Sequence, residues 1–313
     1  MDININFQEI KPPSVVWGLK YAPHIGSFTH SAGKDPIDQI NYMADLGFKA
    51  LEDSGFVSPL VQFNSTRMGI GMCSQTPEML TKIGETLAKR GMEMGTFVLT
   101  PTQWPPVALV TSGKPEYLEE FLTKCKSGVE VAKRLNAKFV TITLDCFDRS
   151  LPIEMQTAHA IDALRKASDI FEPIGVTMAI ETLADHHELF LRTSAQAYML
   201  CKAVNRDACK ILFDMYHLQK NEGRLMYHID MVWDEIGYFQ IGDEPGRCEP
   251  GTGEINYKNI FKHIHQKQQA TGKNFILGME HFNSIDGIEG ENALLEAYKQ
   301  ADSPLNPPMG DLF

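Results

Sequence analysis

The chain has 313 residues, of which 43% are hydrophobic and 22% are charged, and its formal net charge is −11. This composition suits a globular protein with a large core, and it argues against extensive disorder. The acidic excess, without a long run of Lys or Arg, argues against a nucleic-acid surface, which needs clustered cations.

The N-terminal segment MDININFQEIKPP has neither the basic nor the apolar region of a signal peptide. No stretch reaches the length needed to cross a bilayer, so no membrane partner is expected. The six cysteines form no CxxC pair and no zinc-finger spacing, and we expect them to be reduced thiols. A cytoplasmic location is therefore expected, and the sequence leaves open whether a signal peptide was removed.

Short apolar runs alternate with longer segments of helical periodicity along the chain, which is typical of parallel strands joined by helices. Eight strands are predicted, at Val15–Ala22, Ala50–Asp53, Met94–Leu99, Phe139–Leu144, Thr177–Thr182, Lys210–Asp214, Gly237–Ile241 and Phe275–Glu280. Helices are predicted to begin at Pro36 and Pro77 and to span Tyr117–Asn136, Thr157–Phe171, Ser194–Val204, Met226–Glu235, Tyr257–Thr271 and Glu289–Ala301.

The alternation predicts an α/β fold, a (β/α)₈ TIM barrel that forms one domain over residues 1–313. The barrel is expected over about 14–302, followed by an irregular tail over 303–313 that contains three prolines. A doubly wound open sheet is the alternative. No GxGxxG follows the first strand and no GxxxxGK[ST] occurs in the sequence, so the barrel is favoured.

Four successive strands in the second half of the chain carry one oxygen-bearing side chain near their carboxyl end. These residues are Glu181, Asp214, Gln240 and Glu280. In an α/β barrel the carboxyl ends of the strands meet at one face, where the chemistry is located. Each residue taken alone has an ordinary structural explanation, such as an ion pair or a local hydrogen bond. Their recurrence on consecutive strands favours a single site.

Three carboxylates that point into one barrel mouth would repel each other unless a cation lies between them. Three carboxylates and one amide oxygen form a hard ligand set. This set predicts one divalent metal ion, and it favours Mg²⁺ or Mn²⁺ over other metals. Zn²⁺, Co²⁺ and Ni²⁺ are the alternatives.

Other polar and aromatic residues near strand ends are candidates for substrate contacts. Arg247 lies in the loop GDEPGRCEPGTGEINY and could hold a hydroxyl, carboxylate or phosphate group, or form a salt bridge within the loop. Glu52 closes the second strand, where it would orient a ligand or form an ion pair. Trp104 could form the apolar wall beneath a sugar ring, with core packing as the alternative.

The chain resembles the xylose isomerase-like TIM barrels, the sugar isomerase and epimerase superfamily, and within it the hydroxypyruvate isomerase-type proteins. The resemblance is carried by AIETL (179–183), ILFDMYHLQKNEG (211–223), IGYFQIGDEPGRCEPGTGEINY (236–257) and GMEH (278–281). It covers residues 177–282 closely and the rest of the barrel loosely. The first half, with WGLKYAPHIGSF and LTPTQWPP, departs from those isomerases, as does ETLADHHELF, where His186, His187 or Glu188 could contact a different substrate.

The resemblance implies a metal-dependent isomerase that acts on a small α-hydroxy carbonyl compound, either a sugar or a hydroxy-keto acid. Glu181, Asp214, Gln240 and Glu280 match the metal ligands of the family, and His217 and Arg247 match its substrate-contacting residues. Glu181 and Glu280 would exchange a carbon-bound proton through an enediolate. The resemblance also implies self-association, because relatives often form dimers or tetramers.

Four alternative functions remain at this stage. A ketose 3-epimerase, or a dehydratase of keto-sugars or inososes, would use the same metal site and the same bases. A metal-dependent endonuclease acting at abasic sites would need more histidine ligands and a basic surface, which the net charge of −11 disfavours. A sugar-binding barrel without catalysis would rarely need two opposed glutamates.

Overall fold

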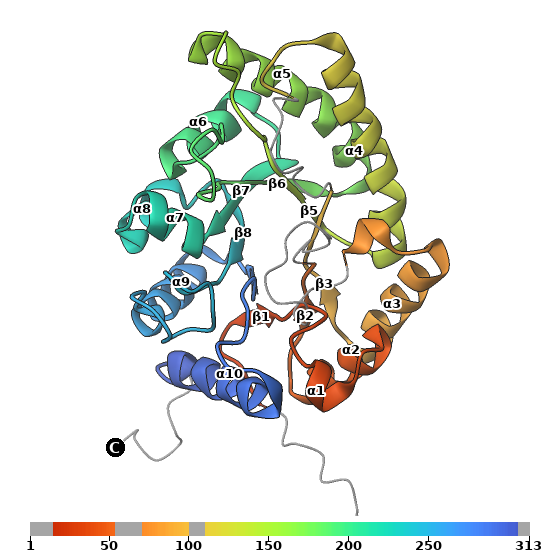
Figure 1. Ribbon diagram of the computed structural model, residues 1–313, viewed down its shortest axis with the longest axis vertical. Helices are drawn as coiled ribbons and strands as arrows, with labels where there is room; N and C mark the ends of the chain where they lie inside the picture. Colours follow the sequence, from red (N-terminus) through yellow and green to blue (C-terminus); the bar gives the residue numbers. More distant parts are fainter. Residues whose placement is uncertain (1–14, 54–70, 100–109, 306–313) are drawn as a thin grey trace, which may run out of the picture.

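The structure is a computed structural model that describes residues 15–53, 71–99 and 110–305. Parallel strands form a central ring and helices surround it (Figure 1). The strands are β1 Lys20–Ala22, β2 Ala50–Leu51, β3 Glu93–Met94, β4 Thr96–Val98, β5 Phe139–Ile142, β6 Thr177–Glu181, β7 Cys209–Asp214, β8 Ile236–Gln240 and β9 Ile276–Gly278. The helices are α1 Thr29–Ala32, α2 Pro36–Asp45, α3 Pro77–Arg90, α4 Pro115–Leu135, α5 Ile153–Phe171, α6 Ser194–Val204, α7 Met215–Asn221, α8 Leu225–Val232, α9 Tyr257–Thr271 and α10 Gly287–Asp302, with 3₁₀ turns at Met72–Ser74 and Glu172–Ile174.

The strands close into a barrel, as the alternating pattern predicted. Seven of them form a sheet in the order β1-β9-β8-β7-β6-β5-β4, and β2 pairs with β3. A parallel bridge between His24 and Glu52 joins the end of β1 to the end of β2. On the other side of β2, Asp53 donates its N–H to the carbonyl of Thr96 at 3.0 Å. The pairing therefore continues around the ring, and the predicted fold class is confirmed.

The predicted strand Met94–Leu99 is interrupted at Gly95, which separates β3 from β4. A Cβ atom at this position would lie 2.5 Å from the hydroxyl of Tyr238 and 3.0 Å from the carbonyl oxygen of Leu51. Only a residue without a side chain allows Tyr238 to cross the barrel here. The pattern of apolar residues could not show this break, because its cause lies on a strand more than a hundred residues away.

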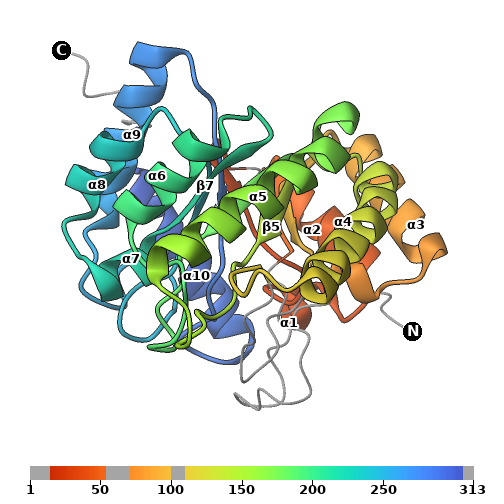
Figure 2. The same cartoon turned by 90° about the horizontal axis from the view of Figure 1, so that it is seen from above.

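Helix α3 begins and ends where capping chemistry predicts. The Thr76 hydroxyl accepts the N–H of Met79 at 3.2 Å, and Pro77 occupies the first position of α3. Gly91 ends the same helix in the left-handed conformation, with φ of 65°. The view turned by 90° shows α4 and α5 lying next to each other on the outside of the sheet (Figure 2). Each helix thus returns the chain to the amino end of the next strand.

A small apolar cluster lies inside the barrel, apart from the large core between strands and helices. It consists of Ala22, Ala50, Ala179, Leu212, Tyr238 and Ile276, with Phe139 packed against it. Three members, Ala179, Leu212 and Tyr238, each lie two residues before a predicted metal ligand. Side chains alternate between the two faces of a strand, so the ligand that follows points to the same interior side. The apolar cluster therefore supports a polar layer at the carboxyl ends of the strands.

The single-domain boundaries stay a prediction, and residues 306–313 of the predicted tail lie outside the described residues. No helix in the described part of the chain is long and apolar enough to span a membrane. All six cysteines are described, and none of them forms a disulfide bond.

Candidate metal centre and active site

The four predicted metal ligands lie at one end of the barrel, on neighbouring strands. Glu181 ends β6, Asp214 ends β7 and Gln240 ends β8. Asp214 is in direct register with Gln240, and Gln240 with Gly278, so Glu280 lies two residues farther along than its neighbours. All four side chains are buried, with relative exposures from 1% to 6%.

His217 is brought over these carboxylates by the start of α7. One oxygen of Asp214, Oδ1, accepts the N–H groups of Tyr216 at 2.7 Å and His217 at 3.1 Å, which caps the helix. The imidazole Nε2 then lies 3.7 Å from Glu181 Oε1 and 3.6 Å from Asp214 Oδ2. The Asp-x-x-His spacing thus brings a strand-end carboxylate and the first turn of a helix together.

The hydrogen bonding of His217 defines which ring nitrogen carries the proton. Its Nδ1 accepts the N–H of Ala184 at 3.2 Å, so a neutral ring has its proton on Nε2. Burial lowers the pKa of His217 well below its usual range, and the nearby Arg247 and Lys220 lower it further. Nε2 is buried and has no hydrogen-bond partner among the described residues. It is therefore a donor directed toward the centre of the site.

Arg247, in the loop after β8, lies beside the same oxygen of Asp214 as His217 does. Its Nη2 lies 3.4 Å from Asp214 Oδ2 and 3.1 Å from Glu280 Oε2. Its guanidinium also lies over the ring of Tyr216, at 5.0 Å. The residue has a φ of 49°, a left-handed conformation that is strained for a side chain of this size. The loop must therefore hold Arg247 in place.

Asp243 provides this support from the base of the loop. Its buried carboxylate accepts the N–H groups of Gly251 at 2.8 Å, Gly253 at 3.0 Å and Ile255 at 3.0 Å. Its own carbonyl accepts the N–H of Arg247 at 2.7 Å. A carboxylate that accepts three backbone donors stabilises the tight turns of this glycine-rich loop.

The carboxylates destabilise one another in the absence of a cation. Burial raises the pKa of Glu181 well above its usual range, and the charges of Glu280 and Asp214 raise it further. Burial raises the pKa of Glu280 to about 8, although the Arg247 guanidinium opposes this shift. Burial raises the pKa of Asp214 as well, and Arg247 again opposes it. One guanidinium does not compensate three buried carboxylates, so the site calls for additional positive charge.

Glu52 lies beneath this layer, fully buried, and accepts a hydrogen bond from Gln240 Nε2 at 2.6 Å. This bond turns the other amide atom, Gln240 Oε1, away from Glu52, and that oxygen is buried without a partner. A Cβ at Gly278 would lie 1.5 Å from Glu52 Oε2, so this glycine makes room for the carboxyl group. The contact is with a predicted ligand, and an acid in this position would orient that side chain.

The donor set fits a divalent cation. An amide oxygen without a partner shares the barrel mouth with three carboxylates, and oxygen atoms are the ligands that hard cations prefer. Glu181 and Asp214 each offer a carboxylate oxygen within 4.8 Å of one another.

Two further side chains at the mouth were not singled out from the sequence. Asp185, four residues after Glu181, has Oδ2 at 3.9 Å from both His217 Nε2 and Arg247 Nη1. Lys220 Nζ lies 3.6 Å from Asp185 Oδ1. The sequence signal that could have identified Asp185 is its position in the loop directly after a strand that ends in a predicted metal ligand. Trp104, the predicted sugar wall, lies outside the described residues.

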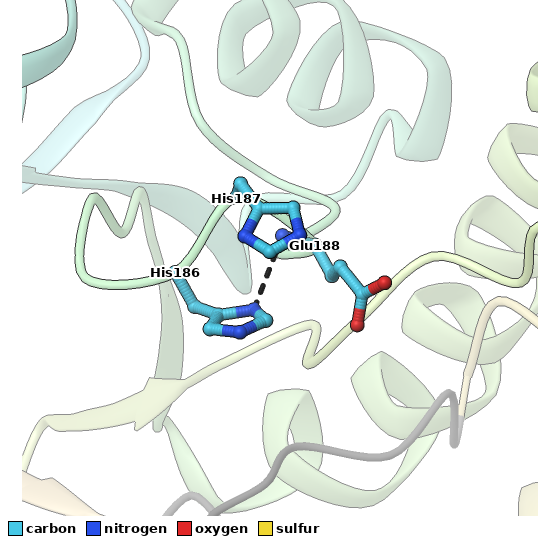
Figure 3. Close-up of side chains that lie close together, drawn as sticks. All are labelled: His186, His187 and Glu188. Carbon is cyan, nitrogen blue, oxygen red and sulfur yellow. Dashed lines mark hydrogen bonds between the residues drawn. The ribbon is translucent and has the colours of Figure 1, made fainter.

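The adjacent residues His186, His187 and Glu188 form a separate group (Figure 3). The two imidazole rings lie 4.4 Å apart, and the Glu188 N–H donates to His186 Nδ1 at 3.2 Å. The Glu188 carboxylate accepts a hydrogen bond from Arg149 Nε at 2.9 Å. Within this loop, Asp185 is therefore the residue that lies beside His217 and Arg247.

Comparison with curated proteins finds isomerases. The chain is 32% identical to hydroxypyruvate isomerase of Escherichia coli (strain K12) over 149 residues, which is 47% of the chain and 57% of that protein. It is 28% identical to 2-oxo-tetronate isomerase of Pectobacterium atrosepticum over 219 residues, 69% of the chain and 79% of that protein. An inosose isomerase of Bacillus licheniformis is 33% identical over 157 residues, 46% of the chain and 54% of that protein.

Solved structures share the fold at low identity. An AP endonuclease, family 2, from Brucella melitensis has a TM-score of 0.69 and 21% identity, over 90% of this chain and 99% of that chain. A D-psicose 3-epimerase has a TM-score of 0.65 and 17% identity, over 89% and 90% of the two chains. The family model described as xylose isomerase-like TIM barrel matches residues 40–300. The chain therefore belongs to the xylose isomerase-like TIM barrel family.

Proposed function

We propose that the protein is a divalent-metal-dependent isomerase of a small α-hydroxy carbonyl compound, with Glu181, Asp214, Gln240 and Glu280 as the metal ligands. The observation that carries this proposal is the convergence of three buried carboxylates and one unpartnered amide oxygen at a single barrel mouth. The curated relatives support it, because those named above are isomerases of hydroxypyruvate, 2-oxo-tetronate and inosose.

A bound metal ion would supply the positive charge that stabilises oxygen atoms of the substrate as the proton moves. Glu181 and Glu280 would move that proton, one removing it from carbon and the other returning it. They are on β6 and beyond β9, which two strands separate in the sheet, so they approach a substrate from different sides. Burial raises the pKa of Glu280, and a bound cation would oppose this shift and favour the charged form that accepts a proton.

His217 and Arg247 would position the substrate. The Nε2–H of His217 is directed into the site and would donate to a substrate oxygen. Arg247 Nη2 lies between Asp214 and Glu280, so it holds both carboxylates in place as well as offering a donor. If His217 and Arg247 each bound one oxygen atom of the substrate, the reacting carbon would stay at a constant distance from the two glutamates.

The proposal is tested by comparing the wild-type protein with Glu280→Gln. The wild-type protein, loaded with Mg²⁺, Mn²⁺ or Zn²⁺, is assayed with hydroxypyruvate, dihydroxyacetone, ketohexoses and inososes. Chelation should remove the activity and metal addition should restore it. Glu280→Gln should lower kcat by at least about a hundredfold, because it removes a proton-transfer group. Full activity in the chelated protein or in Glu280→Gln would contradict the proposal.

A matched control is Glu188→Gln, which makes the same chemical change at a carboxylate paired with Arg149. It should retain the wild-type rate. The products decide between the related reactions. Isomerisation moves the carbonyl group, 3-epimerisation inverts one carbon, and dehydration releases water, so NMR of the product mixture in D₂O distinguishes them.

A further inference from the structure

We infer that Asp185 is a specificity-determining residue that directs the site toward uncharged α-hydroxy ketones and against those that carry a carboxylate. The inference rests on the proposed function and narrows its substrate class. It arises from the loop after β6, whose carboxylate faces the same two donors that would hold the substrate.

The contacts of Asp185 define its position. Its Oδ2 is equidistant, at 3.9 Å, from His217 Nε2 and Arg247 Nη1, and its Oδ1 is 3.6 Å from Lys220 Nζ. All three distances exceed hydrogen-bond length, so the carboxylate faces the donors without saturating them. The side chain is 43% exposed, while His217 is 1% exposed. Asp185 therefore lies at the solvent side of the substrate donors.

This position imposes an electrostatic cost on an anionic substrate. A substrate oxygen hydrogen-bonded to His217 Nε2 or Arg247 Nη1 would lie within about 7 Å of the Asp185 carboxylate. At that separation two like charges repel appreciably at the effective dielectric of a protein surface, and solvent screens part of the repulsion. A hydroxyl group at the same place experiences no such penalty.

The cations at the barrel mouth are already paired with carboxylates, and this pairing reinforces the preference for an uncharged substrate. Arg247 lies between Asp214 and Glu280, and Lys220 lies beside Asp185 with its Nζ 3.3 Å from the Tyr216 hydroxyl. A divalent ion together with Arg247 would balance the three ligand carboxylates, and Lys220 balances Asp185. A neutral substrate leaves this balance unchanged, whereas a carboxylate adds an uncompensated negative charge.

The test uses two substrates of similar size, one anionic and one neutral, that differ at a single group. Hydroxypyruvate and dihydroxyacetone share a hydroxymethyl ketone, and one carries a carboxylate where the other carries a hydroxymethyl group. The ratio of kcat/KM for hydroxypyruvate to that for dihydroxyacetone is measured in the wild-type protein and in Asp185→Asn. We expect the ratio to rise about tenfold in the variant, and the rise to diminish at high salt.

Two matched variants control for unrelated effects. Glu188→Gln removes the same charge from the same loop, at a carboxylate that pairs with Arg149, and should leave the ratio unchanged. Lys220→Gln removes the cation beside Asp185 and should lower the ratio. A second measurement is the affinity of the metal-loaded proteins for pyruvate and hydroxyacetone by calorimetry. Asp185→Asn should strengthen binding of pyruvate and not of hydroxyacetone.

The outcomes separate this inference from the proposed function. An unchanged ratio and an unchanged pyruvate affinity in Asp185→Asn would overturn the inference, while metal-dependent turnover in the same assays would uphold the proposed function. An equal rise of the ratio in Glu188→Gln would also overturn it, because the effect would then be one of net charge. Absence of turnover of every α-hydroxy carbonyl compound by the wild-type protein would contradict the proposed function instead.

Discussion

The floor of the site, formed by Glu52, Gln240 and Gly278, differs from its rim, formed by Asp185 and Lys220. At the floor, Gln240 donates to a fully buried carboxyl group at 2.6 Å, and a glycine leaves the space for it. At the rim, Asp185 lies 3.6 Å or more from its cationic neighbours and is 43% exposed. Short contacts between buried groups hold a geometry, whereas looser and partly exposed charges act through the electric field.

This difference suggests a division of roles. The floor residues are expected to define where the metal ligands lie, so changes there should affect metal binding and every reaction of the site. The rim residues are expected to influence which substrates enter, so changes there should alter preference more than rate. The following predictions test this division, from the largest expected effect to the smallest.

The largest effect is expected at the floor, for Gly278→Ala. Its Cβ would lie 1.5 Å from Glu52 Oε2, so the carboxyl group would be forced away from Gln240. The affinity for Mn²⁺ should fall about 10- to 100-fold, as for the loss of a residue that orients a ligand, and this is measured by calorimetry. Gly246→Ala is the control, because its nearest neighbour, Cys248 Sγ, would lie 3.7 Å away. Equal Mn²⁺ affinity in both variants would contradict the role given to the floor residues in positioning the metal ligands.

A smaller effect is expected for Asp243→Asn, which weakens the support of Arg247. The carboxylate accepts three backbone N–H groups, and an amide can serve only one side of that arrangement. Unfolding in urea should show a loss of about 2–3 kcal/mol, the magnitude for disrupting buried hydrogen bonds to a charged group. kcat/KM should also fall for neutral and charged substrates alike. A variant as stable as the wild type would show that other contacts hold the loop.

The charge of the metal-free site should make stability depend on pH. The Glu280 carboxyl has a pKa of about 8 in the folded protein, against a usual value of 4.5. The unfolded chain therefore loses this proton first, and the metal-free protein should become less stable as pH rises from about 4.5 to about 8. Thermal unfolding after chelation should show this decline, and Mn²⁺ should flatten it. A melting temperature of the metal-free protein that rises over this pH range would contradict the conclusion that the buried carboxylates destabilise one another.

The smallest effect is expected outside the site, for Glu188→Gln. Its ion pair with Arg149 is exposed, with relative side-chain exposures of 39% and 65%. Such pairs contribute about 0–1 kcal/mol, so the unfolding free energy should change by less than about 0.5 kcal/mol. Turnover should stay within about twofold of the wild type. A larger loss of activity would show that the loop after Asp185 carries part of the role assigned to the floor and the rim.

Much of the architecture followed from local patterns. Helix α3 begins at Thr76-Pro77 and ends before Gly91 as its capping residues predicted, and α9 spans Tyr257–Thr271 as predicted. The interruption at Gly95 and the short helix α7 directly after Asp214 were not predicted. Both depend on contacts with distant residues or on a helix too short to show periodicity.

The amino-acid sequence alone predicted the barrel and the four strand-end residues, because strand periodicity and the common orientation of parallel strands determine where such side chains lie. Their roles as ligands stay a proposal. Only the tertiary structure decided the partners of these residues. Gln240 and Glu52 are 188 positions apart, and Arg247 and Asp214 are 33 apart. Such pairs form when the barrel closes and brings separate strands together, and no local pattern of residues encodes that distance.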